Sequence, residues 1–275
     1  MFRIADKKVL NSAVTSLTVE APFIAKKAKA GQFVIVRIDE KGERIPLTVS
    51  DFDPETGTVT LVIQAVGFTT KKLSAMNKGD FLADVVGPLG LPTEFGSPKK
   101  AIVIGGGVGC AIAYPQAKAL HNMGADVTVI AGFRSKDIVI LEEEMKAVSD
   151  RLFITTDDGS YGEKGLVTDV LRRLLDDGGY DLVIAIGPVI MMKFVSLTSK
   201  PYGVKTLVSL NPIMIDGTGM CGGCRVRVGG ETKFACVDGP DFDGHLVDFD
   251  ELMRRNSLFR EEEAHACRLE EKVNG

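Results

Sequence analysis

From Lys100 onward, short apolar runs alternate with segments of helical pattern, and this alternation limits the possible fold more than any other feature. The apolar runs at residues 101–104, 126–132, 152–156 and 181–188 are predicted strands. Helices are predicted between them, namely from the glycine-rich turn to residue 123, over 138–148 and over 166–175. Strands that alternate with helices are typical of a parallel, doubly wound sheet. Continuous apolar strands fit burial on both faces of such a sheet.

The segment before residue 100 has a different sequence pattern. Short runs at 34–38, 58–63 and 81–86 are predicted strands, turn residues separate them, and one short helix is expected around Thr70–Met76. Such spacing favours a small antiparallel barrel. The sequence thus predicts a β plus α/β protein with three parts, an antiparallel β-barrel over 1–98, a nucleotide-binding α/β domain over 99–207, and a small cysteine-bearing subdomain with a charged, solvated tail over 208–275.

Composition excludes several classes of function. The formal net charge is −4, which gives no electrostatic reason to expect nucleic acid or an anionic membrane as a partner. The chain has no run of about 18 apolar residues, and its polar first residues lack a signal-peptide core. Its five cysteines are an odd number, and three of them lie close together. This pattern indicates a reducing, cytoplasmic location and a metal site rather than a disulfide framework.

A glycine-rich turn, Gly105-Gly106-Gly107-Val108-Gly109, follows the first of these strands and opens a helix. Backbone N–H groups in such a turn can approach a phosphate, and the helix N-terminus favours an anion. The G-x-G-x-x-G match is imperfect because Cys110 occupies the third position, so an ordinary tight turn is the alternative. Arg134, after the next strand, could meet a 2′-phosphate or lie in solvent, which leaves NAD and NADP both open. Gly187-Pro188 ends a later strand, where either a ligand site or a simple turn would fit.

The cysteines Cys221, Cys224 and Cys236 have C-x2-C-x11-C spacing. A plant-type [2Fe–2S] loop runs C-x4-C-x2-C, and counting back from Cys221 places Asp216 at the first ligand position. The intervening glycines suit a tight loop with amides directed at sulfur. The alternatives are a structural zinc site or three unrelated buried cysteines. Asp216 could also be an ordinary loop carboxylate, in which case Cys110 and Cys267 are the remaining candidates for the fourth ligand.

With barrel, doubly wound domain and ferredoxin-like loop in this order, the whole chain resembles the ferredoxin–NADP reductase superfamily, in the branch of the dihydroorotate dehydrogenase B electron-transfer subunit. The flavin signature of that family matches residues 44–50, and a second flavin segment matches residues 63–70. Residues 30–33 and 87–90 match as well. The resemblance implies flavin contacts at Arg44, Pro46, Leu47, Thr48, Ser50, Ile63, Gln64, Ala65, Gly67, Thr69 and Thr70. Arg44, Thr69 and Thr70 would face the diphosphate, and Thr48 or Ser50 the isoalloxazine edge.

The aspartate at the first cluster position departs from the four-cysteine pattern of that branch. With this aspartate, the chain is similar instead to the family of small subunits of electron-bifurcating NADH-dependent reduced ferredoxin:NADP+ oxidoreductases. This resemblance implies FAD, NAD(H) and a [2Fe–2S] cluster with one Asp and three Cys ligands, a larger partner subunit bearing flavin and iron–sulfur clusters, and ferredoxin as an indirect partner. Hydride transfer would then be carried by the cofactors, with no catalytic side chain. An electron-transfer subunit for another partner, and a non-enzymatic zinc-bearing protein on the same scaffold, are the alternatives.

Overall fold

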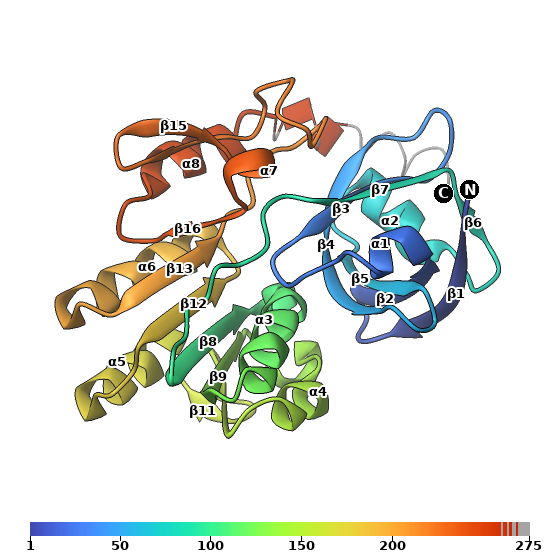
Figure 1. Ribbon diagram of the computed structural model, residues 1–275. Coiled ribbons are helices and arrows are strands. Elements are labelled where there is room, and N and C mark those ends of the chain that lie inside the picture. The colour runs from blue at the N-terminus through green and yellow to red at the C-terminus, as the bar shows by residue number, and fades with distance from the viewer. Residues whose placement is uncertain (260, 263, 266–267, 269–275) are drawn as a thin grey trace.

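The computed structural model describes residues 1–259, 261–262, 264–265 and 268, and it consists of two sheets and a small third unit (Figure 1). Cys267 and most of the predicted charged tail lie outside the described residues. The predicted fold class, an antiparallel barrel followed by a doubly wound sheet, is confirmed.

The first sheet is an antiparallel barrel with the strand order β6-β1-β2-β5-β4-β3-β7. Alternate residues of its strands point into one core, as in β5, where Val59, Leu61 and Ile63 are buried. The strands are β1 (Phe2–Val9), β2 (Val14–Glu20), β3 (Phe33–Arg37), β4 (Ile45–Asp53), β5 (Thr58–Gln64), β6 (Phe81–Leu82) and β7 (Asp84–Leu89), and the helices are α1 (Pro22–Ala25) and α2 (Phe68–Ala75).

The second sheet has the strand order β11-β10-β9-β8-β12-β13-β16, and all of its pairs are parallel except the last. Its strands are β8 (Lys100–Gly106), β9 (Asp126–Phe133), β10 (Arg151–Thr156), β11 (Glu163–Lys164), β12 (Leu182–Ile186), β13 (Lys205–Ser209) and β16 (Asp241–Asp243). Helices α3 (Cys110–Asn122) and α4 (Glu142–Ala147) share a core with one face of the sheet, and α5 (Val167–Asp177) and α6 (Val189–Ser199) share a core with the other.

The third unit follows β13 and returns to the sheet at β16. It contains the hairpin β14 (Arg225–Val228) and β15 (Glu231–Phe234), the short helix α7 (Ala235–Asp238) and, after β16, helix α8 (Phe249–Asn256). Its buried residues belong to the same hydrophobic core as α5 and α6. The unit is therefore attached to one face of the nucleotide-binding sheet, as Figure 1 shows.

The predicted helix over 138–148 differs from the structure. A 3₁₀ turn covers Lys136–Ile138, and α4 begins only at Glu142. The β-branched residues Ile138, Val139 and Ile140 disfavour helix here, since branching at Cβ restricts χ1 against the preceding turn. Leu141 then takes a left-handed conformation, with φ of 57°, immediately before the helix.

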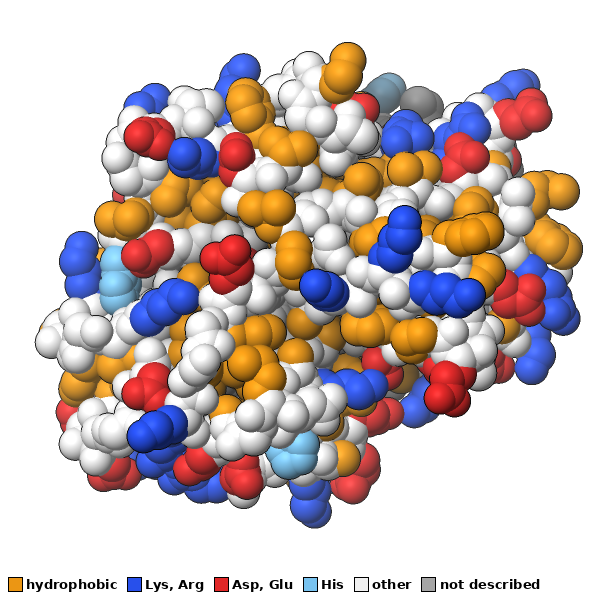
Figure 2. All heavy atoms as spheres, in the orientation of Figure 1, with side chains coloured by type: hydrophobic (Ala, Val, Ile, Leu, Met, Phe, Trp, Pro, Cys, Tyr) orange, Lys and Arg blue, Asp and Glu red, His pale blue; other side chains and the backbone are white. Residues whose placement is uncertain are grey.

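In the part of the chain that the structure describes, no helix is both long and apolar enough to cross a bilayer. Figure 2 shows lysine and arginine side chains interspersed with aspartate and glutamate over the visible face. This face carries no large field of one sign, which agrees with the small net charge.

Candidate flavin and iron–sulfur site

The first predicted flavin segment lies on β4, between β3 and β5 in the barrel. Arg44 precedes the strand, and Pro46, Leu47 and Thr48 lie along it, each half-buried. Their side chains are thus reachable from the surface of the barrel without being free in solvent. Such positions can contact a bound planar ring while the strand fixes their direction.

Ser50 has a different environment from its neighbours on β4. Its side chain is buried, and its hydroxyl donates a hydrogen bond of 2.6 Å to the carbonyl oxygen of Ala111 in α3. Next to it, Lys118 Nζ and Asp51 Oδ1 form an ion pair of 2.8 Å between α3 and the barrel. In this structure Ser50 therefore joins the barrel to the nucleotide-binding domain, a role that the flavin motif did not indicate.

The second predicted flavin segment runs from the end of β5 into α2. Thr70 caps the start of this helix, because its Oγ1 accepts a hydrogen bond of 2.9 Å from the backbone N–H of Gly67. The Thr69 hydroxyl donates to the carboxylate of Glu43. Gln64 is exposed and Ala65 is half-buried. Ile63 belongs to the barrel core, so only its main chain could reach a ligand.

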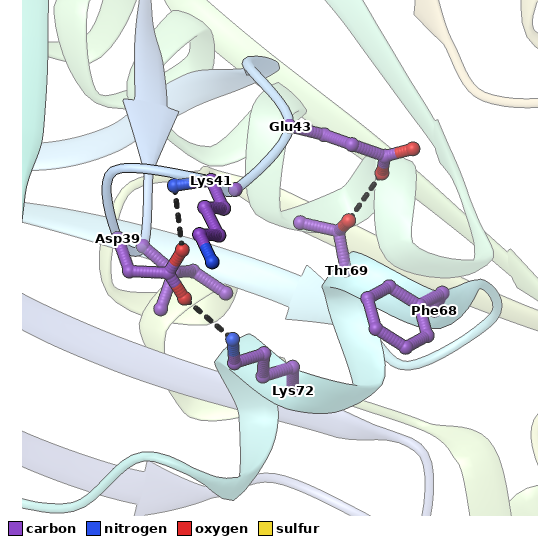
Figure 3. Close-up of a pocket in the computed structure, with 8 residues that line it drawn as sticks. Asp39, Lys41, Glu43, Phe68, Thr69 and Lys72 are labelled. Atoms are coloured by element: carbon purple, nitrogen blue, oxygen red, sulfur yellow. Dashed lines mark hydrogen bonds and ion pairs between the residues drawn. The ribbon is translucent and has the colours of Figure 1, made fainter. Parts of the chain in front are cut away.

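A pocket lies at the N-terminus of α2, between that helix and the loop after β3 (Figure 3). Thr69 and Phe68 line one side, and Lys41 lines the other. Lys72 also lines the pocket and donates a 2.5 Å hydrogen bond to Asp39, and this bond holds the pKa of Asp39 below its ordinary value. Asp39 and Glu43 line the pocket together with the two lysines, so the feature here that suits an anionic diphosphate is the N-terminus of α2.

The glycine-rich turn and the Gly187-Pro188 turn come together at the carboxyl ends of β8 and β12. A Cβ on Gly109 would lie 2.4 Å from the Ile186 carbonyl oxygen, and one on Gly187 would lie 3.1 Å from Gly106 Cα. Most of these glycines are therefore needed for close contact between backbones. Gly107 is the exception, since its φ is +56° and no heavy atom lies within 4 Å of its ideal Cβ.

The space beside Gly107 is open, and the sequence predicts a dinucleotide site here, at the carboxyl ends of β8 and β12. Cys110 lies behind the turn, where a Cβ on Gly105 would be 2.7 Å from its sulfur. It is wholly buried, and burial raises the pKa of its thiol to about 12. Cys110 thus packs the helix against the strand, in a different core from Cys224 and Cys236. Arg134 is exposed after β9.

The cysteine loop brings two of its three thiols into contact, since the sulfurs of Cys224 and Cys236 are 3.2 Å apart. Cys221 is exposed to solvent, and the amide N–H of Gly223 approaches its sulfur at 3.4 Å. The Cys236 amide likewise approaches the sulfur of Cys224 at 3.4 Å. Among the described residues, no three His, Cys, Asp or Glu side chains are already grouped closely enough to hold a metal ion.

The donor set nevertheless fits an iron–sulfur cluster. Backbone N–H groups directed at cysteine sulfur are the hydrogen bonds that tune such clusters. The amide of Gly223, the largest influence, lowers the pKa of Cys221, whereas burial, the largest influence, raises the pKa of Cys236 to about 12. A coordinating metal deprotonates thiols outright, so both could serve as thiolate ligands.

Asp216 organises the start of this loop. Its Oδ2 accepts hydrogen bonds from the Thr218 hydroxyl and from the amides of Thr218, at 2.9 Å, and Met220, at 3.2 Å. The bond from the Thr218 hydroxyl, followed by that from its amide, lowers the pKa of Asp216. The half-buried carboxylate is therefore ionised at neutral pH and lies in the loop with the cysteines, as an oxygen ligand would require.

The cluster loop and the flavin segments are in contact. A Cβ on Gly217 would lie 2.8 Å from the Ile35 side chain and 3.1 Å from that of Leu89, both in the barrel. Arg44 Nη2 approaches the Asp216 carbonyl oxygen at 3.4 Å. The sequence predicted both sites but gave no sign that Arg44 would join them.

A buried polar group, Asp241 with its partners, was missed by sequence reasoning. Asp241 Oδ2 accepts from the hydroxyl of Thr93 in the interdomain linker and from Gln116 Nε2 of α3, the latter at 3.2 Å. Burial raises the pKa of this carboxyl. The group joins the linker, α3 and β16. The only signal in the sequence is one aspartate among several in an acidic stretch.

Comparison with known proteins agrees with this architecture. Residues 211–248 match the family model of the iron–sulfur cluster binding domain of dihydroorotate dehydrogenase B. A Clostridium beijerinckii protein described as an uncharacterized protein in the adh 3′ region is 54% identical, with 97% of this chain and 93% of that protein covered. A Thermotoga maritima homologue of the dihydroorotate dehydrogenase B (NAD+) electron transfer subunit is 50% identical, over 94% of this chain and 92% of its own length.

Among solved structures, a chain of the NADH-dependent reduced ferredoxin–NADP oxidoreductase, studied for flavin-based electron bifurcation, is 48% identical. It superposes with a TM-score of 0.92 over 97% of this chain and 96% of its own length. The fold and the loop define a flavin- and iron–sulfur-dependent oxidoreductase of the ferredoxin–NADP reductase type. More particularly, the chain belongs to the family of dihydroorotate dehydrogenase B electron-transfer subunits and their homologues. The chain of the solved oxidoreductase structure described above is one of these homologues.

Proposed function

We propose that this chain is the small, electron-transfer subunit of an NADH-dependent reduced ferredoxin:NADP+ oxidoreductase. It would act within a heterodimer whose larger subunit carries further flavin and iron–sulfur centres, with ferredoxin as an indirect partner. The observation that carries the proposal is the contact between the cluster loop and the flavin segments, through Gly217 and Arg44. The likeness to the oxidoreductase chain over nearly its whole length supports it.

The residues suggest the following division of work. The barrel would hold FAD, with Arg44, Thr69 and Thr70 near the diphosphate and with residues 46–48 along the ring. Gly107, Val108 and Gly187 would receive NAD(H) at the carboxyl ends of β8 and β12, and Arg134 would lie near its ribose. Bound there, FAD supplies the conversion of a two-electron hydride donor into single electrons. The fold contributes orientation and proximity, and it brings no acid or base to the reaction.

The cluster ligands would be Asp216, Cys221, Cys224 and Cys236. The loop stays close to the barrel because Ile35 and Leu89 pack beside Gly217. The alternative is that Asp216 organises the loop without binding iron, since its carboxylate already accepts three hydrogen bonds within the loop. An experiment must therefore separate ligation from loop structure.

The test compares Asp216→Cys with Asp216→Asn in the full chain, each purified and reconstituted with iron, sulfide and FAD. If Asp216 is a ligand, we expect both variants to change the visible and EPR spectra of the cluster, because each replaces the hard anionic oxygen donor. The asparagine keeps an oxygen that can accept the loop hydrogen bonds. If Asp216→Asn retains the wild-type spectra and cluster potential, Asp216 only organises the loop.

The wider proposal is tested by adding NADH to the reconstituted wild type. We expect the flavin absorption to bleach and the EPR signal of the reduced cluster to appear. Copurification from the native cell should recover a larger subunit that contains flavin. A partner that oxidises dihydroorotate would instead favour the second candidate, the electron-transfer subunit of dihydroorotate dehydrogenase B, which the match over residues 211–248 supports.

A further inference from the structure

The end of helix α8 holds the cluster loop at two points. Arg255 Nη2 donates a hydrogen bond of 3.1 Å to the Gly223 carbonyl oxygen, between Cys221 and Cys224. The next residue, Asn256, donates through Nδ2 to the Asn211 carbonyl oxygen at 3.2 Å, where the loop segment begins. The family model ends at residue 248, so both contacts come from outside the matched domain.

Helix α8 is a firm support for these contacts. Phe249 and Leu252 are buried in the core that also contains Cys224 and Cys236. The carboxylate of Asp248 caps the helix by accepting the Glu251 amide at 2.9 Å. The Glu251 carboxylate in turn pairs with Arg227 of the hairpin at 2.9 Å. The guanidinium of Arg255 is therefore presented to the loop from a packed element.

Gly223 is the residue through which Arg255 reaches the cluster site. The N–H of Gly223 approaches the Cys221 sulfur at 3.4 Å, and its carbonyl group accepts from Arg255. These two groups belong to consecutive peptide planes on either side of Gly223, and glycine has the widest choice of backbone conformation. The Arg255 bond therefore fixes the peptide between Gly223 and Cys224 rather than the N–H that approaches Cys221. Arg255 thus constrains the backbone that leads into Cys224, beside Cys221, which is the most exposed of the three cysteines.

Within the described residues, the charge of Arg255 has no partner of opposite sign. Its Nε is buried and has no hydrogen-bond partner among the described residues. Arg227 on the neighbouring hairpin has Glu251, but no carboxylate of the described part of the chain pairs with Arg255. A partly buried, unpaired cation is unfavourable unless negative charge lies nearby. An iron–sulfur cluster held by four anionic ligands would provide that charge.

We propose that Arg255 is a positioning residue that raises the reduction potential of the [2Fe–2S] cluster, by holding the peptide between Gly223 and Cys224 and by placing a cation beside the loop. A cluster held by this loop would gain one negative charge on one-electron reduction. A fixed cation stabilises the reduced form more than the oxidised form, and the effect is strongest in a poorly solvated site. The inference rests on the proposed function in one respect, that this loop holds the cluster.

The test is an EPR-monitored redox titration of the reconstituted full chain, with the variants Arg255→Gln, Arg255→Lys and Arg254→Gln. Arg254→Gln is the matched control, since it removes an exposed charge from the adjacent position of α8. We expect Arg255→Gln to lower the cluster midpoint potential by an amount equal to roughly a tenfold change in the one-electron equilibrium, about 59 mV. Arg255→Lys, which keeps the charge, should recover most of this shift, and Arg254→Gln should remain near the wild type.

Equal potentials for Arg255→Gln and Arg254→Gln would overturn the inference. If Arg255→Gln fails to retain iron, Arg255→Lys decides, because a lysine variant with cluster and near-native potential supports a role for the charge, and a lysine variant without cluster refutes it. Failure of the proposed function has another signature, namely that the wild-type chain itself takes up no iron and sulfide. The potential is read without NADH, ferredoxin or the partner subunit, so it does not depend on the activity of the complex.

Discussion

The two glycine-rich segments of this protein use the same residue for different reasons. In the turn after β8, Gly105, Gly106 and Gly109 leave room for neighbouring atoms, and added Cβ atoms would lie 2.4–2.7 Å from their nearest neighbours. In the cluster loop, Gly219 and Gly222 have φ of +87° and +67°, while the nearest atoms to their ideal Cβ positions lie at 3.2 and 3.6 Å.

The turn is therefore limited by space, whereas Gly219 and Gly222 of the loop are limited mainly by backbone conformation. Gly217, where an added Cβ would lie 2.8 Å from the Ile35 side chain at a φ of +82°, is limited by both. A segment limited by space is part of the core, and its disruption should affect the whole domain. A segment limited by conformation can be strained while the sheets beneath it remain intact. The comparison predicts global effects for substitutions in the turn and local effects for substitutions in the loop.

The largest effect is expected for Gly109→Ala. The new methyl group would meet the Ile186 carbonyl oxygen at 2.4 Å and Gly187 Cα at 2.8 Å, so the two turns would have to separate. We expect a loss of about 3 kcal/mol in the free energy of unfolding, at the upper end of the usual cost of overpacking. Urea denaturation measures it. The matched control is Gly107→Ala, where only a left-handed φ must be accommodated, at about 1–2 kcal/mol. Equal stabilities of the two variants would break the comparison.

A smaller and local effect is expected for Gly222→Ala. The methyl group has space, so the cost is that of a left-handed alanine, about 1–2 kcal/mol, and it falls on the loop between Cys221 and Cys224. We expect lower iron content per chain after reconstitution, with little change in the melting temperature of the apoprotein. Gly222→Asn should retain more iron because asparagine accepts this conformation better. A large drop in apoprotein melting temperature would show that the loop, too, is part of the core.

The third prediction concerns pH and Asp241, the buried carboxyl group of β16 that accepts hydrogen bonds from Thr93 and Gln116. Burial raises the pKa of its carboxyl above the ordinary value of 3.8, so the folded state binds the proton more tightly than the unfolded state does. Its ionisation therefore opposes folding as pH rises above that value. We expect the stability of Asp241→Asn relative to the wild type to increase as the pH rises from about 4 to neutral. Urea denaturation of both proteins at these two pH values measures the increase. The exposed Asp126→Asn is the control, and a difference that stays constant with pH for Asp241→Asn would contradict the prediction.

Much of the architecture could be predicted because it follows from periodicity. The alternation after Lys100 indicated the parallel sheet, and the short runs before it indicated the barrel, since each pattern reflects which faces are buried. Helix α6 was missed because its apolar residues, including the exposed Ile190 and Phe194, show little amphipathic pattern. The strand β16 was missed because three residues with two aspartates carry no strand signal.

The candidate site divides in the same way. Chemical types at fixed spacing, such as the cysteines and Asp216, can be recognised in sequence because the ligand chemistry demands them. The bond from Ser50 to Ala111 and that from Arg255 to Gly223 join residues that are 61 and 32 positions apart. Such pairs depend on how packed elements meet in space, and no local pattern encodes them. The structure supplies these links, and the roles of the predicted ligands remain predictions.

The position of β16 has a consequence for how the protein is made. This strand covers the outer edge of β13, yet it leaves the ribosome only after Cys236 has emerged. A nascent chain that has not reached residue 243 would expose the unpaired edge of β13, which is a template for aggregation. The sheet therefore acquires its last strand only after every cysteine of the loop has been synthesised.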